Sequence, residues 1–200
     1  MKNQPENVEQ LKTEHEKKIK NADIDRGVVI VNTGDGKGKS TAAFGTAFRA
    51  VGYGMKVGIV QFIKGKWKTG EQQIFAGLPQ ITHVISGEGF TWNSEDNTKD
   101  IEAARKGWEF ALGMIEEARD DEDSYQLIVL DEINIAMDKD FIPAASVVEA
   151  IKAKPEHLSI ILTGRNAPPE IIEAADTVTE MKPIKHAFEG GIKARKGIEF

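Results

Sequence analysis

Residues 33–41, TGDGKGKST, have the composition of a loop that binds a phosphate chain. They follow the apolar run GVVIV and precede AAFGTAFRAVG, so they lie where a strand turns into a helix. Small residues let the backbone fold around an anion, and successive N–H groups point at it together with the helix N-terminus. Lys39 adds a cation, and the Ser40 hydroxyl can bind magnesium. The predicted nucleoside-triphosphate contacts are Gly34, Asp35, Gly36, Lys37, Gly38, Lys39, Ser40 and Thr41.

The loop departs from the general phosphate-loop pattern at one position. The pattern GxxxxGK[ST] requires a glycine at position 33, where this chain has Thr33, and Gly34 and Gly36 compensate in part. A glycine-rich turn without a ligand is the simpler alternative. Such a turn does not require three glycines, two lysines and a Ser-Thr pair, so we favour a nucleotide site. The loop alone does not define the reaction.

A second candidate site follows the apolar run at residues 126–130. The run ends in Asp131 and Glu132, at the edge where open α/β sheets bind ligands. These carboxylates suit a magnesium site opposite Ser40. Adjacent strand residues point to opposite faces, so only one is expected to bind the metal directly unless the strand ends between them. The residues alone leave open which of the two is the ligand, and a helix cap is the alternative to a metal site.

Three further polar residues follow predicted strands. Lys64 comes after VQFI and would bring its ammonium near the triphosphate, although a solvated lysine fits almost equally well. Arg165 follows IILTG, and Asn134 follows the two carboxylates. Either of these two residues could serve the site or only the structure.

Two aromatic residues, Phe90 and Trp92, lie in the polar segment 86–100. Aromatics in such loops most often pack on their own domain. A loop of this length is also often functional, and the pair could form an apolar wall for a large, flat ligand. Composition alone favours the packing role.

The elements that must position these residues alternate along the chain. Strand-like runs occupy residues 27–31, 56–62, 81–86, 126–131, 158–164 and, with a weaker pattern, 176–181. Apolar spacing predicts helices over 101–115 and 144–151. This alternation predicts an α/β fold of the P-loop NTPase, RecA-like type, with three layers around a mostly parallel sheet. Residues 27–200 would form this domain.

Residues 1–26 differ from the rest in having many charges and few apolar side chains. Val8, Leu11, Ile19 and Ala22 could line a thin helical stripe. A frayed, solvated extension and a docking helix fit the composition about equally well.

Composition limits the classes of function. The chain of 200 residues has 40% hydrophobic residues, no cysteine and a net charge of −6. The charge argues against a nucleic-acid binder, and the lack of cysteine excludes thiol catalysis. No apolar run approaches the length of a membrane span, and the N-terminal residues do not resemble a signal peptide. We therefore expect a cytoplasmic protein with no nucleic-acid or membrane partner.

Taken together, six motifs resemble the ATP:corrinoid adenosyltransferases of cobalamin salvage and biosynthesis. They are TGDGKGKSTAAFG, VQFIKG, GFTW, VLDE, LTGR and KHAFEGGIKARKGI, in this order across residues 27–200. Thr33 matches what this family shows. Ser40 stands where many members have threonine, which supplies the same hydroxyl group.

The resemblance implies transfer of the 5′-deoxyadenosyl group from ATP to the cobalt of a reduced corrinoid such as cobalamin, with triphosphate as the leaving group. The family holds ATP in reverse along the loop, which brings the 5′ carbon to the reaction centre. The resemblance implies that Ser40 and Glu132 hold magnesium, with Asp131 as a supporting neighbour, and that Lys64 contacts ATP. By position in the family pattern, Arg49 and the segment KHAFEGG are further candidates for ATP contacts. Because cob(I) is itself a strong nucleophile, no catalytic Ser, Cys or His is required.

The same resemblance gives Phe90 and Trp92 a role in displacing the lower axial ligand of cob(II)alamin, which eases reduction of the cobalt. It also implies a homodimer whose N-terminal helix can cover the corrinoid site of the partner. The chain has no redox cofactor motif, so a flavoprotein is the expected reductant.

Two other classes of function also fit the phosphate loop. One is a RecA-like P-loop ATPase or small-molecule kinase, in which Glu132 or Asp131 would activate water or an acceptor hydroxyl. The other is a non-catalytic module that binds ATP and corrinoid. The co-occurrence of Thr33 with GFTW favours the transferase over both alternatives, and a general ATPase has no need for the aromatic loop.

Overall fold

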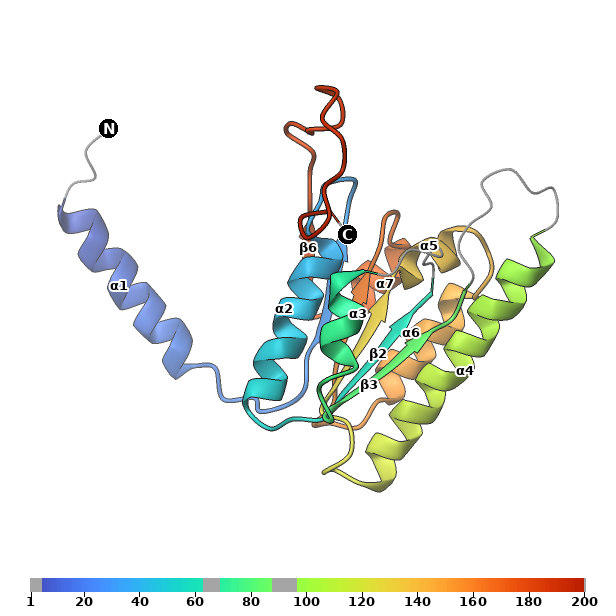
Figure 1. The fold of residues 1–200 in the computed structure, drawn as a ribbon. Coiled ribbons are helices and arrows are strands. Elements are labelled where there is room, and N and C mark those ends of the chain that lie inside the picture. The colour runs from blue at the N-terminus through green and yellow to red at the C-terminus, as the bar shows by residue number, and fades with distance from the viewer. Residues whose placement is uncertain (1–4, 63–68, 88–96, 200) are drawn as a thin grey trace.

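The computed structural model describes residues 5–62, 69–87 and 97–199 (Figure 1). Within these residues, the strands form one sheet in the order β3-β2-β4-β5-β1-β6, with every neighbouring pair parallel. The strands are β1 (Val29–Thr33), β2 (Val57–Gln61), β3 (Ile81–Ile85), β4 (Leu127–Asp131), β5 (Ser159–Thr163) and β6 (Thr177–Glu180). The helices are α1 (Pro5–Lys20), α2 (Lys39–Gly52), α3 (Gly70–Phe75), α4 (Thr98–Asp120), α5 (Ile133–Asp138), α6 (Ala144–Ala153) and α7 (Pro169–Ala174). The predicted α/β class is confirmed, and all the predicted strands are present.

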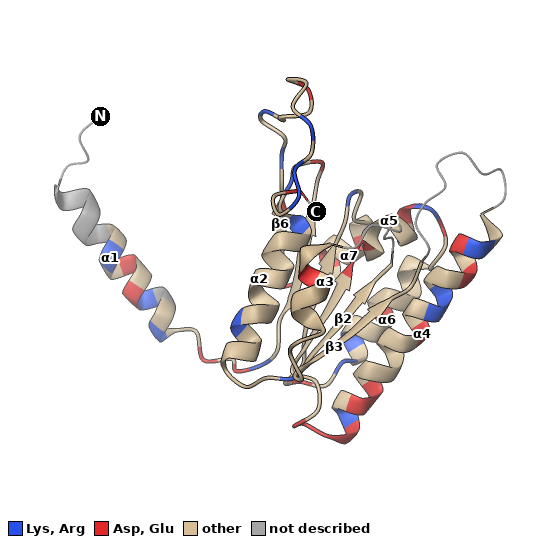
Figure 2. Cartoon of the chain, in the orientation of Figure 1, with Lys and Arg blue, Asp and Glu red and all other residues tan. Residues whose placement is uncertain are grey.

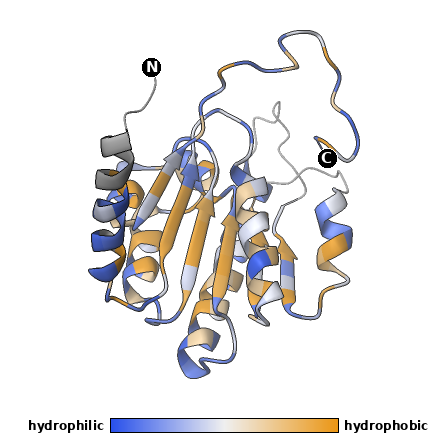
Figure 3. Cartoon of the chain, turned by 90° about the vertical axis from the view of Figure 1, so that its left-hand side faces the viewer, coloured by the Kyte–Doolittle hydropathy of each residue, from blue (hydrophilic) through white to orange (hydrophobic). Residues whose placement is uncertain are grey.

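The inner strands β1, β2, β4 and β5 are largely apolar because helices cover both faces of the sheet, whereas all four residues of the edge strand β6 are exposed. Every residue of β2 and β4 is buried. Figure 3 shows the strands mostly in the hydrophobic colours, between helices whose outer faces are hydrophilic.

Helices α2 and α3 cover one face of the sheet. Phe44 and Ala47 of α2 and Phe75 of α3 pack with Ile59 and Val129 from the strands. The rings of Phe44 and Phe75 meet edge to face, with 5.2 Å between their centroids. This layer fixes α2, and with it the loop that precedes α2, against the sheet.

Helices α4, α5, α6 and α7 cover the opposite face. Trp108, Ile133, Val147 and Ile171, one from each helix, belong to the same buried cluster as Leu130 of β4. Trp108 is thus a core residue, as the helical spacing of its neighbours predicted. The three-layer arrangement is confirmed.

The four inner strands break their apolar pattern near the carboxyl edge. Asn32, Gln61, Asp131 and Thr163 are buried polar residues at or next to the ends of β1, β2, β4 and β5. Gln61 is paired in register with Asp131, and Asn32 with Thr163. Because side chains alternate along a strand, these residues share the face covered by α2 and α3 with Ile59. We call this set the polar row.

Helix α1 stands apart from the sheet and its covering helices (Figure 1). The apolar side chains of Leu11 and Ile19 are 58% and 61% exposed. Charged residues line the described part of α1 and the length of α4 (Figure 2). Among the residues that the structure describes, no helix combines the length and apolarity needed to cross a membrane.

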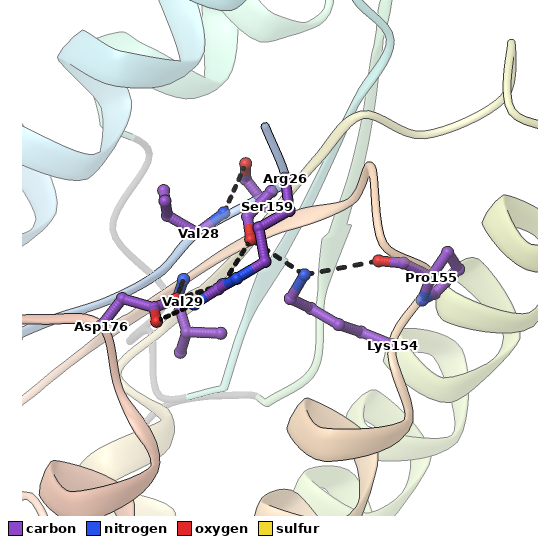
Figure 4. A network of polar contacts seen from close by, with 8 residues as sticks. Arg26, Val28, Val29, Lys154, Pro155, Ser159 and Asp176 are labelled. Carbon is purple, nitrogen blue, oxygen red and sulfur yellow. Dashed lines mark hydrogen bonds and ion pairs between the residues drawn. The ribbon is translucent and has the colours of Figure 1, made fainter. Parts of the chain in front are cut away.

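At the amino edge of the sheet, Asp176 joins the beginnings of β1 and β6 (Figure 4). Its Oδ2 accepts hydrogen bonds from the Val29 amide at 2.8 Å and from Arg26 at 2.9 Å. Lys154 donates to the Gly27 carbonyl at 3.0 Å, and burial lowers the pKa of this lysine. These contacts hold the chain entering β1 against the end of α6.

We expect acid to weaken the fold through Asp176. Its hydrogen bonds from Arg26 and then from Val29 lower the pKa of its carboxyl from 3.8 to about 2. Because the folded-state pKa is depressed, the contribution to stability is complete above about pH 4 and is lost as the pH falls toward about 2. Urea unfolding of wild type and Asp176→Asn should differ most near neutral pH and converge in this acid window. A difference that stays constant down to about pH 2 would contradict the assignment.

Candidate functional site

The loop after β1 owes its shape to three glycines. Gly34 and Gly38 have φ values of 91° and 109°, a region that side chains other than glycine rarely adopt. A Cβ atom at Gly36 would lie 2.7 Å from the Met181 carbonyl oxygen. The Gly36 amide instead donates to that oxygen at 2.7 Å. The loop is therefore packed against the residue that follows β6.

Thr33, the departure from the general pattern, has a structural role here. Its side chain is buried, and its Oγ1 accepts a hydrogen bond from the Ala167 amide at 3.2 Å. Its carbonyl accepts from the Met181 amide at 2.8 Å. Thr33 thus ties the base of the loop to the residue after β6 and to the segment after β5. A glycine at this position would keep the backbone hydrogen bond to Met181 but lose the one from Ala167.

The ammonium of Lys39 lies inside the loop. Lys39 is only 8% exposed, and its Nζ donates to the Gly36 carbonyl at 2.7 Å. Burial lowers the pKa of Lys39, and the negative charge of nearby Glu132 opposes that shift. A buried cation held by its own loop is oriented for an anion before the anion arrives.

The two carboxylates after β4 have different environments. Asp131 is 1% exposed; its Oδ2 accepts from Gln61 Nε2, and its Oδ1 from Thr163 Oγ1, each at 2.8 Å. The strand ends at Asp131, and Glu132 adopts a left-handed conformation with φ 66°. Glu132 precedes the first residue of α5 but makes no side-chain cap hydrogen bond there. Asp131 is therefore directed into the polar row, whereas Glu132 lines the cavity described next.

A cavity of about 770 Å³ opens at the carboxyl edge of the sheet. Loop residues 35–41 form one wall, and Glu132 and Arg165 come from the ends of β4 and β5. Thr69 and His186 line other parts of it. The Arg165 Nε lies 3.4 Å from an Asp35 carboxylate oxygen, which adds a second cation near the loop. The cavity is of the size that small-molecule ligands occupy.

The structure brings some of the sequence-predicted residues together and not others. Ser40 and Glu132 line the same cavity. Arg49 is exposed in the last turn of α2, away from the residues that line the cavity. Lys64, Phe90 and Trp92 lie outside the described residues, so their predicted roles stay predictions.

Other residues near the site have structural roles or were not anticipated. Asn134 is fully buried and donates to the Gly164 carbonyl at 3.0 Å, which is a packing role. Sequence reasoning missed Thr69 and the ion pair between Lys37 and Glu199, which folds the chain near the C-terminus over the loop. The spacing of the motifs held no signal for either of them.

The residues at the cavity fit magnesium only in combination with a nucleotide. Ser40 and Glu132 supply hard oxygen donors, which magnesium prefers. Among the described residues, no group of three or more His, Asp or Glu side chains could hold a metal ion. Magnesium commonly uses one or two carboxylates and takes its remaining ligands from phosphates and water.

A parallel sheet with a glycine-rich loop after β1 and a carboxylate beyond β4 defines a nucleotide-binding α/β protein of the P-loop NTPase class. Residues 25–200 match the family described as ATP:corrinoid adenosyltransferase BtuR/CobO/CobP, and the chain belongs to this family. The corrinoid adenosyltransferase of Pseudomonas aeruginosa is 45% identical, over 98% of this chain and 94% of its own length. That of Escherichia coli K12 is 40% identical, over 96% and 95%. The corresponding Salmonella typhimurium enzyme is 39% identical, over 96% and 95%. The resemblance inferred from the six motifs is confirmed.

Proposed function

We propose that the chain transfers the 5′-deoxyadenosyl group of ATP to the cobalt of a reduced corrinoid. The observation that carries this proposal is the cavity at the carboxyl edge, where loop residues 35–41, Glu132 and Arg165 surround a space for a triphosphate. The family, and relatives named corrinoid adenosyltransferase that match nearly the whole chain, support the reaction.

The reaction is a displacement at the 5′ carbon of ATP. The electron pair of cob(I) forms the cobalt–carbon bond while the bond between the 5′ carbon and its oxygen breaks. Triphosphate leaves with the two electrons of that carbon–oxygen bond. Because the nucleophile is the substrate, the protein need only align the reactants and stabilise charge on the leaving group.

The described residues suit that task. Loop amides and the Lys39 ammonium would bind the triphosphate, and Arg165 stands near the same loop. Ser40 and Glu132 would hold magnesium, which supplies neutralising charge to the triphosphate when it is bound. In this proposal ATP lies in reverse along the loop, and Glu132 has no role in activating water.

The corrinoid side of the site is proposed to involve the segment between β3 and α4. Phe90 and Trp92 would form an apolar wall at the lower face of the corrinoid, which disfavours an axial base or water there. The exposed apolar side chains of Leu11 and Ile19 on α1 would suit a helix that covers the corrinoid site of a second subunit. We further propose a cytoplasmic homodimer that receives electrons from a flavoprotein.

Phe90→Ala and Trp92→Ala should each reduce turnover that begins from cob(II)alamin by about tenfold or more, because an axial ligand would return to cobalt. ATP affinity should persist. Turnover from chemically reduced cob(I)alamin in the same variants is the control. An equal loss of ATP binding would show that the aromatic residues support the nucleotide site instead.

The proposal is tested by incubating the protein anaerobically with magnesium, ATP and chemically reduced cobalamin. The cob(I) spectrum should disappear, with adenosylcobalamin and intact triphosphate as products. Formation of ADP and orthophosphate with an unchanged corrinoid would instead identify an ATPase or a kinase. Binding of both ligands without products would identify a non-catalytic module.

A further inference from the structure

Glu132 has a backbone conformation that other contacts must maintain. Its φ of 66° and ψ of 18° lie in the left-handed region, which is unfavourable for a residue with a side chain. The Glu132 amide donates to Thr163 Oγ1 at 3.0 Å. This hydrogen bond joins the turn after β4 to the end of β5.

The Thr163 hydroxyl is part of a longer hydrogen-bonded chain. A hydroxyl has one proton, which Thr163 donates to Asp131 Oδ1, while its lone pair accepts from Glu132. Asp131 Oδ2 accepts from Gln61 Nε2, and Gln61 Oε1 lies 2.8 Å from His83 Nε2. The chain thus crosses from β3 through β2 and β4 to β5 and ends at the Glu132 backbone.

The Asp131 carboxylate sets the direction of every hydrogen bond in this chain. Both Asp131 oxygens accept, one from Thr163 and one from Gln61, so Gln61 turns its amide nitrogen to Asp131 and its oxygen to His83. His83 then carries its proton on Nε2. Each side chain in this series therefore has one hydrogen-bonding orientation. Together they form one defined support for the Glu132 backbone.

Burial makes this support stiff. Gln61 and Asp131 are each 1% exposed, and Thr163 is fully buried. In such surroundings hydrogen bonds are strong and the loss of one partner is costly for the group that it leaves unpaired. None of the three is among the described residues that line the cavity. The hydrogen bond from the Glu132 amide to Thr163 links them directly to a residue that lines the cavity.

We propose that Thr163, Asp131 and Gln61 are positioning residues that hold Glu132 toward magnesium and the triphosphate. This inference rests on the proposed function, in which Glu132 is a magnesium ligand. Breaking these hydrogen bonds should weaken the magnesium-dependent part of ATP binding and leave ATP binding without magnesium unchanged. A general loss of stability would lower both.

The first test compares Thr163→Val with Thr163→Ser by titrating ATP at a series of magnesium concentrations, with thermal unfolding followed in parallel. Thr163→Val removes the hydroxyl at nearly constant volume. It should raise the magnesium concentration that gives a half-maximal increase in ATP affinity about tenfold. Thr163→Ser keeps the hydroxyl and should stay within about twofold of wild type. Thr82→Val is the matched control, because it removes another sheet hydroxyl that accepts from Tyr125 at 3.0 Å.

A second test exchanges the amide and the carboxylate between positions 61 and 131. Gln61→Glu alone would set two carboxylates against each other and should raise the magnesium requirement. Adding Asp131→Asn restores every hydrogen bond, because the introduced amide can donate to position 61 and accept from Thr163. The double variant should therefore bind magnesium and ATP better than Gln61→Glu.

The outcomes separate the inference from the proposed function. If Thr163→Val folds and keeps the wild-type magnesium requirement while Glu132→Gln raises it, the positioning role is overturned and the metal site stands. If Glu132→Gln also leaves the requirement unchanged, the metal assignment is wrong and the positioning role falls with it. If Thr163→Val does not fold, the comparison of Gln61→Glu with the double variant decides. A double variant that requires as much magnesium as Gln61→Glu overturns the inference.

Discussion

Lys39→Met is expected to lower kcat/KM for adenosyl transfer by about 10² to 10³, the usual loss when an enzyme loses one preorganised charge on a leaving group. The ammonium is buried within the loop and already oriented by the Gly36 carbonyl at 2.7 Å. Methionine keeps much of the packing but supplies no charge. Steady-state rates with reduced cobalamin at varied ATP concentrations measure the effect.

Lys37→Met is the matched control for that experiment. The Lys37 side chain is 55% exposed and is paired with Glu199, so its charge is screened by water. We expect a reduction of less than about tenfold. If both variants lose activity equally, the loop acts through its total charge and the special role of Lys39 is refuted.

Glu132→Gln is expected to lower the rate at limiting magnesium by about 10². The amide keeps the size of the side chain and the backbone hydrogen bond to Thr163, but it binds magnesium far more weakly than a carboxylate. Saturating magnesium should recover part of the rate. Magnesium titrations of the rate at fixed ATP give the measurement.

Asp138→Asn makes the same change of charge at the other end of α5, where Asp138 accepts from Asn166 at 3.0 Å. It should leave the magnesium dependence of the rate unchanged. An equal response in both variants would mean that charge on α5 in general, and not a ligand at Glu132, controls the metal.

Much of the fold was predictable because its signals are local. Apolar runs identified most of the strands, a weaker pattern over residues 176–181 predicted β6 (Thr177–Glu180), and glycine spacing located the loop. The sequence did not decide which of Asp131 and Glu132 would face the site, since this depends on where β4 ends. Short helices such as α3 and α7 carry too few residues to show a period.

Contacts between distant strands were not predictable in the same way. The polar row depends on register, and a sequence does not state that Gln61 will lie beside Asp131 or that Thr163 will hold the next amide. The only sign was that several apolar strands end on a polar residue. Likewise, nothing near Gly36 in the chain indicates that Met181 will pack against it.

The contact between the loop and Met181 also bears on the order of folding. The Gly36 amide and the Thr33 carbonyl both bond to Met181, which follows the last strand of the sheet. Strand β1 lies between β5 and β6. The first strand in the sequence can therefore pair on both sides only after the last two strands have formed. Pairings of such high contact order form slowly. The nucleotide loop should therefore acquire its native shape late, and ATP should recognise the assembled sheet and not a folding intermediate.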